Sequence, residues 1–214
     1  FHTKYWNGNF YLSPHYKGKP DDRAQALAVI AGILPESEYP VIRPFFKQQY
    51  HASPYMEKYV LEALCMMGYY EDALERMKER YYDMVESELT TLWEGWGIGS
   101  KGFGGGSYNH AWSGGPLTIL SQYFAGISPM KPAFKEFVIN PVCNCFGEIQ
   151  SVTPTKWGKI ELSLTNKLNV IVAKVKIPRK TKGHFIIPDG IEKYRINGKE
   201  KVAKKGVIVL KEGI

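Results

Sequence analysis

The sequence has few cysteines, no long apolar segment and no low-complexity tract, and each absence excludes a class of protein. Three cysteines in 214 residues are too few and too unevenly spaced for a disulfide framework, and the odd count leaves at least one thiol unpaired. The longest apolar runs, such as residues 26–31, are far shorter than the roughly 20 residues that span a bilayer. We therefore expect a soluble chain without membrane insertion, and its compartment stays open.

The sequence also lacks the ligand spacing of a metal site and the motifs of a nucleic-acid-binding protein. Cys143 and Cys145 are one residue closer than a Cys-x-x-Cys pair, and no second pair lies nearby. The net charge of +7 is concentrated from residue 142 onward, where 15 basic residues face 6 acidic ones, but few aromatic residues lie between the lysines. Solvated sheet edges explain these lysines better than a nucleic-acid surface. We expect no metal, no cofactor and no nucleic-acid partner.

The composition is that of a globular protein, and the apolar pattern divides it into two parts. Apolar residues make up 44% of the chain and charged residues 23%. Up to about residue 135 the apolar residues recur with helical spacing, whereas beyond it they alternate as in strands. We therefore predict an α+β, multidomain chain, in which residues 1–135 are helical and residues 136–214 form a small antiparallel β-sandwich.

Four helices are predicted in the first part. Asp21 or Asp22 caps the first helix, whose expected apolar face is Ala24, Leu27, Ala28, Ala31 and Leu34. The second begins with a serine cap and a proline at residues 53–54 and ends before Gly68. The third covers about residues 70–85, and the fourth starts near residue 115. The charged residues of these helices, Glu57 and Arg76 among them, are expected at caps or on the surface.

The second part contains about seven short strand patterns. Ile160, Leu162 and Leu164 alternate with polar residues, and the pair Asn197–Gly198 is a strong hairpin signal. Further strands are expected near residues 137–140, 170–177 and 207–210. Four helices are too few to close a helical toroid, and the chain begins with Phe1 rather than methionine. These observations favour a fragment of a longer protein.

The segment most informative about chemistry is residues 90–115. It contains three tryptophans, one histidine and many glycines, and Glu94 is its only carboxylate. Tryptophan faces stack on sugar rings, while asparagine, histidine and glutamate reach hydroxyl groups, so the composition favours a carbohydrate site. The glycine run at residues 102–106 is only a weak phosphate-loop signal, because it lacks the Gly-Lys-Ser/Thr ending.

Glu94 is the best candidate for a general base that activates water. It lies between Trp93 and Trp96, and apolar walls desolvate a carboxylate and raise its pKa toward the working pH. The alternative is a glutamate that accepts backbone hydrogen bonds in a tight loop. His110 is a candidate for sugar contact or a structural histidine, and Trp112 fits the core as well as the site.

Two motifs in this segment, TLWE at residues 91–94 and SYNHAWSGGP at residues 107–116, resemble the bacterial α-L-rhamnosidases of glycoside hydrolase family 78. The similarity continues through residues 126–141, and the predicted helices at residues 21–34 and 53–68 also resemble those that precede the motif in the family. The resemblance implies the end of an (α/α)₆ barrel followed by a β-sandwich. It also implies inverting hydrolysis of terminal α-L-rhamnose, with Glu94 as the general base and His110 at the sugar.

The resemblance further implies a rhamnose-containing glycoside or oligosaccharide as substrate. Together with the composition of the loop, it leads us to expect Asn109 beside His110 at the sugar, and Trp93, Trp96 and Trp112 forming or supporting the walls. Inverting enzymes need two carboxyl groups, and nothing before Asp21 resembles the family's general acid. We expect the isolated chain to be inactive, and to form a homodimer or associate with the missing N-terminal part. Two other interpretations stay open: an inactive carbohydrate-binding or scaffolding module, and a binder of nucleic acid or acidic glycans.

Overall fold

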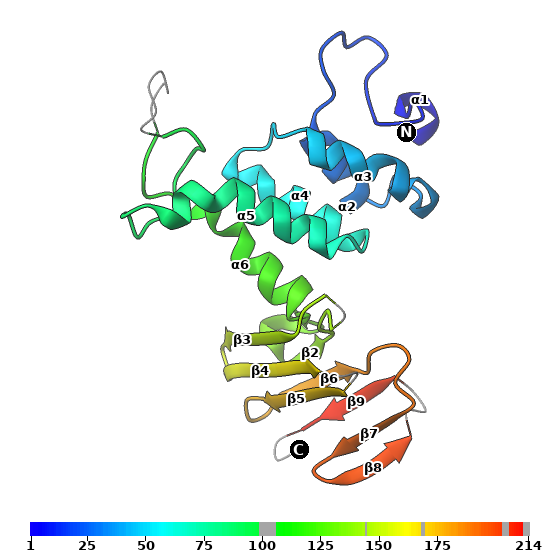
Figure 1. The fold of residues 1–214 in the computed structure, drawn as a ribbon, viewed down its shortest axis with the longest axis vertical. Helices are drawn as coiled ribbons and strands as arrows, with labels where there is room; N and C mark the ends of the chain where they lie inside the picture. The colour runs from blue at the N-terminus through cyan, green and yellow to red at the C-terminus, as the bar shows by residue number, and fades with distance from the viewer. Residues whose placement is uncertain (99–105, 144, 168–169, 203–205, 212–214) are drawn as a thin grey trace. The chain divides into compact units, whose positions relative to one another are not determined.

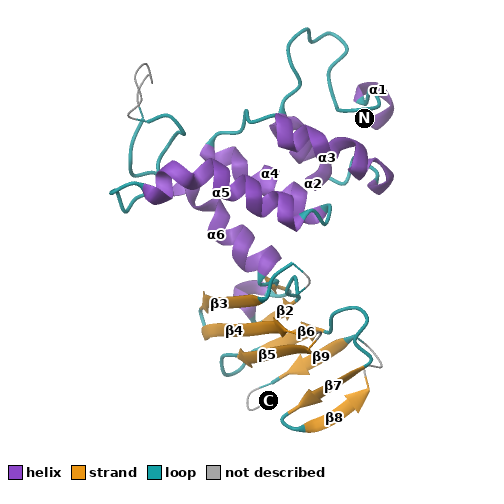
Figure 2. Cartoon of the chain, viewed as in Figure 1, coloured by secondary structure: helices purple, strands orange, loops and turns teal. Residues whose placement is uncertain are grey.

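The computed structural model describes residues 1–98, 106–143, 145–167, 170–202 and 206–211. Contacts divide the chain into two compact units, Phe1–Ile119 and Leu120–Ile214. Helices form the first unit and strands dominate the second, which confirms the predicted α+β class (Figure 2). Among the described residues no helix is long and apolar enough to cross a membrane.

The first unit is a set of packed helices, and a long loop, residues 6–21, connects α1 to α2 (Figure 1). Its elements are α1 (His2–Tyr5), α2 (Asp22–Ile30), η1 (Glu36–Glu38), α3 (Tyr39–Gln48), α4 (Pro54–Met66), α5 (Tyr70–Glu86), η2 (Ala111–Gly114) and α6 (Gly115–Ile119).

Helix α4 is central in this unit, because it packs against α2, α5 and α6. Its predicted start is confirmed: Ser53 is the N-cap, and its hydroxyl accepts a hydrogen bond from the Met56 N–H at 3.4 Å. Its end is confirmed as well, since Gly68 follows with a φ of +83°. The third predicted helix, at about residues 70–85, is confirmed as α5.

The apolar face predicted for α2 is wrong in part: Ala28 and Leu34 are buried as expected, but Ala31 is exposed, and so are two further residues. Asp21 caps the helix, but Ala24 and Leu27 are exposed, whereas the buried residues of α2 are Asp22, Gln25, Ala26, Ala28 and Val29. The periodicity was ambiguous because nearly every position from 24 to 31 is apolar. The side of α2 that is buried is set by polar groups with specific partners. Gln25, on the buried side, exchanges two hydrogen bonds with the backbone of Tyr11, at 2.7 and 2.9 Å.

Two buried carboxylates and a buried arginine tie α2, α4 and α5 together. The Arg76 guanidinium donates to Asp22 at 2.6 Å and to Glu57 at 2.5 Å, and it also donates to the backbone carbonyls of Phe46 and Gln49. Asp22 and Glu57 are fully buried. The expectation that Glu57 and Arg76 lie on the surface is therefore wrong, because each charge is satisfied by a partner from another helix.

The described residues of the second unit form three sheets. Its strands are β1 (Ile127–Pro129), β2 (Glu136–Ile139), β3 (Glu148–Thr155), β4 (Gly158–Lys167), β5 (Val170–Lys176), β6 (Lys182–Ile186), β7 (Lys193–Ile196), β8 (Lys199–Val202) and β9 (Val207–Leu210), and η3 (Leu120–Phe124) and η4 (Pro132–Phe134) accompany them. The sheet orders are β1-β2-β6-β9, β3-β4-β5 and β7-β8. Strands β2 and β6 pair in parallel. A parallel pair needs a long crossover connection, and here the chain segment that contains β3, β4 and β5 provides it.

The core of this unit lies between the sheets. Ile160, Leu162 and Leu164 of β4 are buried beside Phe137 and Ile139 of β2, which confirms the alternation predicted for β4. The predicted hairpin is confirmed too. Its two turn residues, at positions 197 and 198, have φ values of +47° and +80°, as a type I′ turn requires.

The second unit begins at Leu120, ahead of the predicted boundary at residues 135/136. Strand β1 pairs with β2, and η3 contacts both β1 and β3, so residues 120–135 share contacts with the strands that follow them. Gly126 joins η3 to β1 with a φ of +68°, and a Cβ there would overlap the backbone of Asn140.

Candidate active site

The two flanks of the aromatic segment lie side by side in the first unit. The Glu94 N–H donates to the Ser107 carbonyl at 2.9 Å, and the His110 N–H donates to the Leu92 carbonyl at 2.7 Å. Thr91 adds a hydroxyl bond to the Tyr108 carbonyl. These backbone bonds bring together the two motifs noted in the sequence. Of the glycine run, residues 102–105 lie outside the described residues.

Glu94 is held by two groups from the opposite flank. Its carboxylate oxygen Oε2 accepts a hydrogen bond from the Ser107 N–H at 2.8 Å, and the same oxygen lies 3.5 Å from His110 Nδ1. The side chains of Glu94 and His110 are each 36% exposed, so solvent and small molecules reach both. A carboxylate oriented by a backbone N–H and open to solvent is able to accept a proton from water.

His110 connects this carboxylate to an exposed tryptophan. Its ring centroid lies 4.2 Å from that of Trp112, and its Nδ1 lies 3.3 Å from the Ser107 hydroxyl. Trp112 donates its indole N–H to the Glu94 carbonyl at 3.3 Å, yet 42% of the residue is exposed. Glu94, His110, Trp112 and Ser107 therefore form one cluster.

The other two tryptophans face α5. Trp93 is buried, packs edge-on against Tyr108, and its carbonyl accepts a bond from the buried Ser113 hydroxyl. Trp96 donates its indole N–H to the Ala52 carbonyl at 2.7 Å, and the Arg80 guanidinium lies 4.4 Å over its ring. Both residues anchor the loop to neighbouring segments of the first unit, and both line a hollow of about 420 Å³ beside α5.

Asn109 is exposed, and its carbonyl accepts a bond from the Ser107 hydroxyl at 3.4 Å. Sequence reasoning missed Ser107, which contacts both Glu94 and His110, although it opens the second motif. It also missed Tyr55, whose ring lies 5.4 Å from that of Trp112. The spacing of Tyr55 and Tyr59, one helical turn apart at the start of α4, was the available signal.

The cluster contains one carboxylate. In the part of the chain that the structure describes, no second carboxyl group shares a hydrogen-bond or ion-pair partner with Glu94. The same residues contain no group of histidine, cysteine or acidic side chains arranged to hold a metal ion. The described residues of the cluster thus supply a single carboxyl group, that of Glu94.

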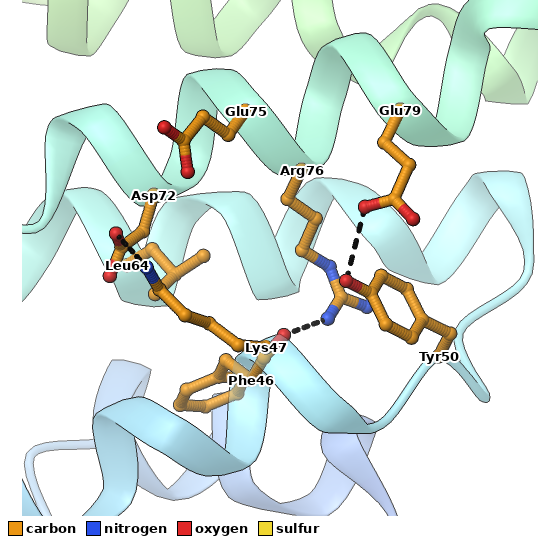
Figure 3. A pocket seen from close by; sticks show the side chains of 8 residues that line it. All are labelled: Phe46, Lys47, Tyr50, Leu64, Asp72, Glu75, Arg76 and Glu79. Carbon is orange, nitrogen blue, oxygen red and sulfur yellow. Dashed lines mark hydrogen bonds and ion pairs between the residues drawn. The ribbon is translucent and has the colours of Figure 1, made fainter.

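A smaller cavity of about 110 Å³ lies between α3, α4 and α5 (Figure 3). Several polar groups around it are engaged with one another: Lys47 pairs with Asp72 at 2.7 Å, the Tyr50 hydroxyl donates to Glu79 at 3.1 Å, and Arg76 donates to the Phe46 carbonyl. This cavity belongs to the packing of the helices rather than to the candidate site.

Residues 126–203 match the sequence model of the bacterial alpha-L-rhamnosidase C-terminal domain. They include most of the second unit, from β1 to β8. Among curated proteins, none matches the sequence.

Solved α-L-rhamnosidases share the fold of most of the chain. The structure from Dictyoglumus thermophilum aligns with 89% of this chain (TM-score 0.69, 20% identity), and that of a family 78 rhamnosidase from Bacillus sp. GL1 aligns with 87% (0.70, 20%). The Streptomyces avermitilis enzyme, solved with L-rhamnose, aligns with 93% (0.71, 18%). The chain spans about a fifth of these structures, 21–22% of their length.

These matches show first that most of the chain has the fold of solved glycosidases, with helices followed by sheets. More particularly, the predicted resemblance to the bacterial α-L-rhamnosidases of glycoside hydrolase family 78 is confirmed.

Proposed function

We propose that this chain is the C-terminal part of an inverting glycoside hydrolase that releases terminal α-L-rhamnose from glycosides or polysaccharides. Glu94 is the general base: it takes a proton from a water molecule while that water attacks the anomeric carbon. An acid on the opposite face of the sugar protonates the leaving oxygen. His110 and Asn109 bind sugar hydroxyls, Trp112 provides a stacking face, and Trp93 and Trp96 support the loop.

The observation that carries the proposal is the contact between Glu94, Ser107 and His110. The Ser107 N–H fixes one carboxylate oxygen at 2.8 Å, and His110 lies 3.5 Å from that oxygen. The hydrogen bond holds the carboxylate in one orientation, and this geometry allows a water molecule to be placed reproducibly.

The general acid belongs, in this proposal, to a part of the polypeptide outside these 214 residues. Two features support this: the cluster holds one carboxylate, and the similar solved enzymes are about four times as long as the chain. A third feature is an exposed apolar surface. Helix α4 packs against both α2 and α6, and these three helices expose the large apolar side chains of Leu27, Met66 and Leu117. These are suited to pack against further helices of a barrel, or against a second copy of the chain.

Replacing Glu94 with glutamine tests the assignment in the longest reading frame that contains this chain. Glutamine keeps the shape and still accepts the Ser107 N–H, but it cannot take a proton. We expect α-L-rhamnoside turnover to fall about 100- to 10,000-fold while L-rhamnose binding is retained. The matched control is Glu88→Gln, a nearby exposed glutamate, which should leave turnover unchanged.

Near-normal turnover of the Glu94→Gln protein would remove Glu94 from the mechanism. Rhamnose binding without turnover, in both the unmutated protein and the variant, would instead favour a carbohydrate-binding module.

A further inference from the structure

A series of side chains in contact extends from Glu94 to the first turns of α4. His110 lies against Glu94 and stacks on Trp112; the Trp112 ring lies 5.4 Å from that of Tyr55, and Tyr55 lies 5.9 Å from Tyr59. All five belong to the first unit. The aromatic surface next to the candidate base is therefore longer than one sugar ring needs.

A hollow of about 320 Å³ opens along this series. Tyr55, Lys58 and Tyr59 of α4 line one side, and Trp112, Gly115 and Thr118 line the other. Such a volume is at the lower end of those typical of small-ligand sites. Tyr55 and Trp112 are each 42% exposed, so their faces are available to a ligand.

Gly115 keeps the two sides of the hollow close together. A Cβ at this position would overlap the side chain of Lys58 and press on its backbone, so only glycine lets α6 start against α4. This approach places η2, and with it Trp112, beside Tyr55. The glycines of the second motif thus shape the hollow by packing.

The polar groups around the hollow favour a neutral sugar over an acidic one. Lys58 is the cation in its lining, and its ammonium already donates to Glu62 at 2.6 Å and lies 4.8 Å over the Tyr59 ring. The hydroxyls of Tyr55 and Tyr59 lie 3.5 Å apart and are suited to bind sugar hydroxyls. Aromatic faces stack on the C–H faces of pyranose rings.

We propose that this hollow is a second sugar subsite, which binds the neutral sugar that carries the terminal rhamnose. The inference rests on the proposed function, since it places rhamnose at Glu94 and His110 and the next sugar on Trp112 and Tyr55. With this subsite, the preferred substrate is an oligosaccharide rather than a rhamnoside of a small alcohol.

The test compares two substrates in the longest reading frame that contains this chain: methyl α-L-rhamnoside, which lacks the second sugar, and an α-L-rhamnosyl-glucose disaccharide. The measured quantity is the ratio of kcat/KM for the disaccharide to kcat/KM for the methyl glycoside. We expect Tyr55→Ala to lower this ratio about 3- to 10-fold, the order of an aromatic stacking contact. Tyr55→Phe, which keeps the ring, should retain most of it.

Two further variants separate the subsite from a folding effect. Thr118→Phe fills the hollow without removing a ring and should lower the same ratio. Tyr82→Ala removes an exposed tyrosine of α5 and should leave it unchanged. An unaltered ratio in both Tyr55→Ala and Thr118→Phe would overturn the subsite. If the unmutated protein hydrolyses neither substrate, the proposed function fails and the subsite with it.

Discussion

Among single residues, Arg76 of α5 joins three other helices of the first unit, through Asp22 of α2, Glu57 of α4 and the Phe46 carbonyl of α3. Burial alone would lower the pKa of Arg76, but hydrogen bonds to Glu57, together with the charges of Glu57 and Asp22, raise it above its usual value. The guanidinium therefore stays charged inside the unit. Its neighbour Arg80 lies 3.6 Å from Glu57, and burial lowers the pKa of Arg80.

Replacing Arg76 with methionine should destabilise the first unit strongly. Methionine fills similar space, but Asp22 and Glu57 lose their main partner while buried, and breaking such a pair costs about 3–5 kcal/mol. Urea unfolding of the 214-residue chain measures the loss. The matched control is Lys78→Met on the exposed side of α5, where we expect a change within about 0.5 kcal/mol. Equal stability of the two variants would contradict this role of Arg76.

The buried carboxylate of Asp72 predicts a pH dependence of stability. Hydrogen bonding from Arg43, assisted by Lys47, lowers the pKa of Asp72 below its usual value in the folded chain. A lowered folded pKa means that its contribution is fully present above the unfolded pKa, about 3.9, and is lost as the pH falls through the folded pKa. The melting temperature of Asp72→Asn should therefore be below that of the unmutated chain at pH 7, and the difference should shrink below about pH 4. A difference independent of pH would refute this account.

The burial of these charges could not be predicted from the sequence. Helical spacing assigns Arg76 and Glu57 to polar faces, and their contacts join positions 19 and 54 residues apart. In the candidate site, Glu94 and His110 could be named because they lie in short motifs of unusual composition. Tyr55 was missed, because its spacing from Tyr59 is a local signal that does not show the packing of η2 against α4, which brings Tyr55 to Trp112.

At the level of elements, local sequence signals correctly predicted the ends of helices and turns whose geometry depends on residues close together in the sequence. The Ser53 cap, the end of α4 at Gly68 and the hairpin at residues 197–198 are set by backbone geometry within a few residues. Helix α3 was not predicted, because Pro40 and Pro44 disrupt its pattern; the structure has one in the first turn and the other inside the helix. The parallel pairing of β2 with β6 joins segments about 45 residues apart, and no local signal specifies it.

The turn before β1 should be intolerant of a side chain. Gly126→Ala would place a Cβ against the Asn140 backbone at a φ of +68°, and we expect a loss of stability greater than about 1 kcal/mol. Gly147→Ala is the control, because nothing lies within 4 Å of a Cβ there and its φ is not in the left-handed region. Thermal melting of the two variants measures the difference. A Gly126→Ala chain as stable as the control would show that the turn relaxes without cost.

For the whole molecule, similarity extends over most of this chain but over only 21–22% of the solved rhamnosidases. Composition and periodicity predicted a helical part followed by strands, and the structure agrees. The boundary at residues 119/120 was not predicted, because the contacts of η3 and β1 with the later strands are tertiary. In the proposed function, the intact protein needs Glu94 and a second carboxyl group that lies elsewhere in the polypeptide.

The most direct test of this account is hydrolysis of a chromogenic α-L-rhamnoside, measured in parallel on the 214-residue chain and on the longest reading frame that contains it. We predict turnover by the longer protein, loss of that turnover in its Glu94→Gln form, and none by the chain alone, since an inverting mechanism needs both carboxyl groups. Turnover by the purified 214-residue chain would contradict the division of the active site. Absence of turnover in both would contradict the rhamnosidase function itself.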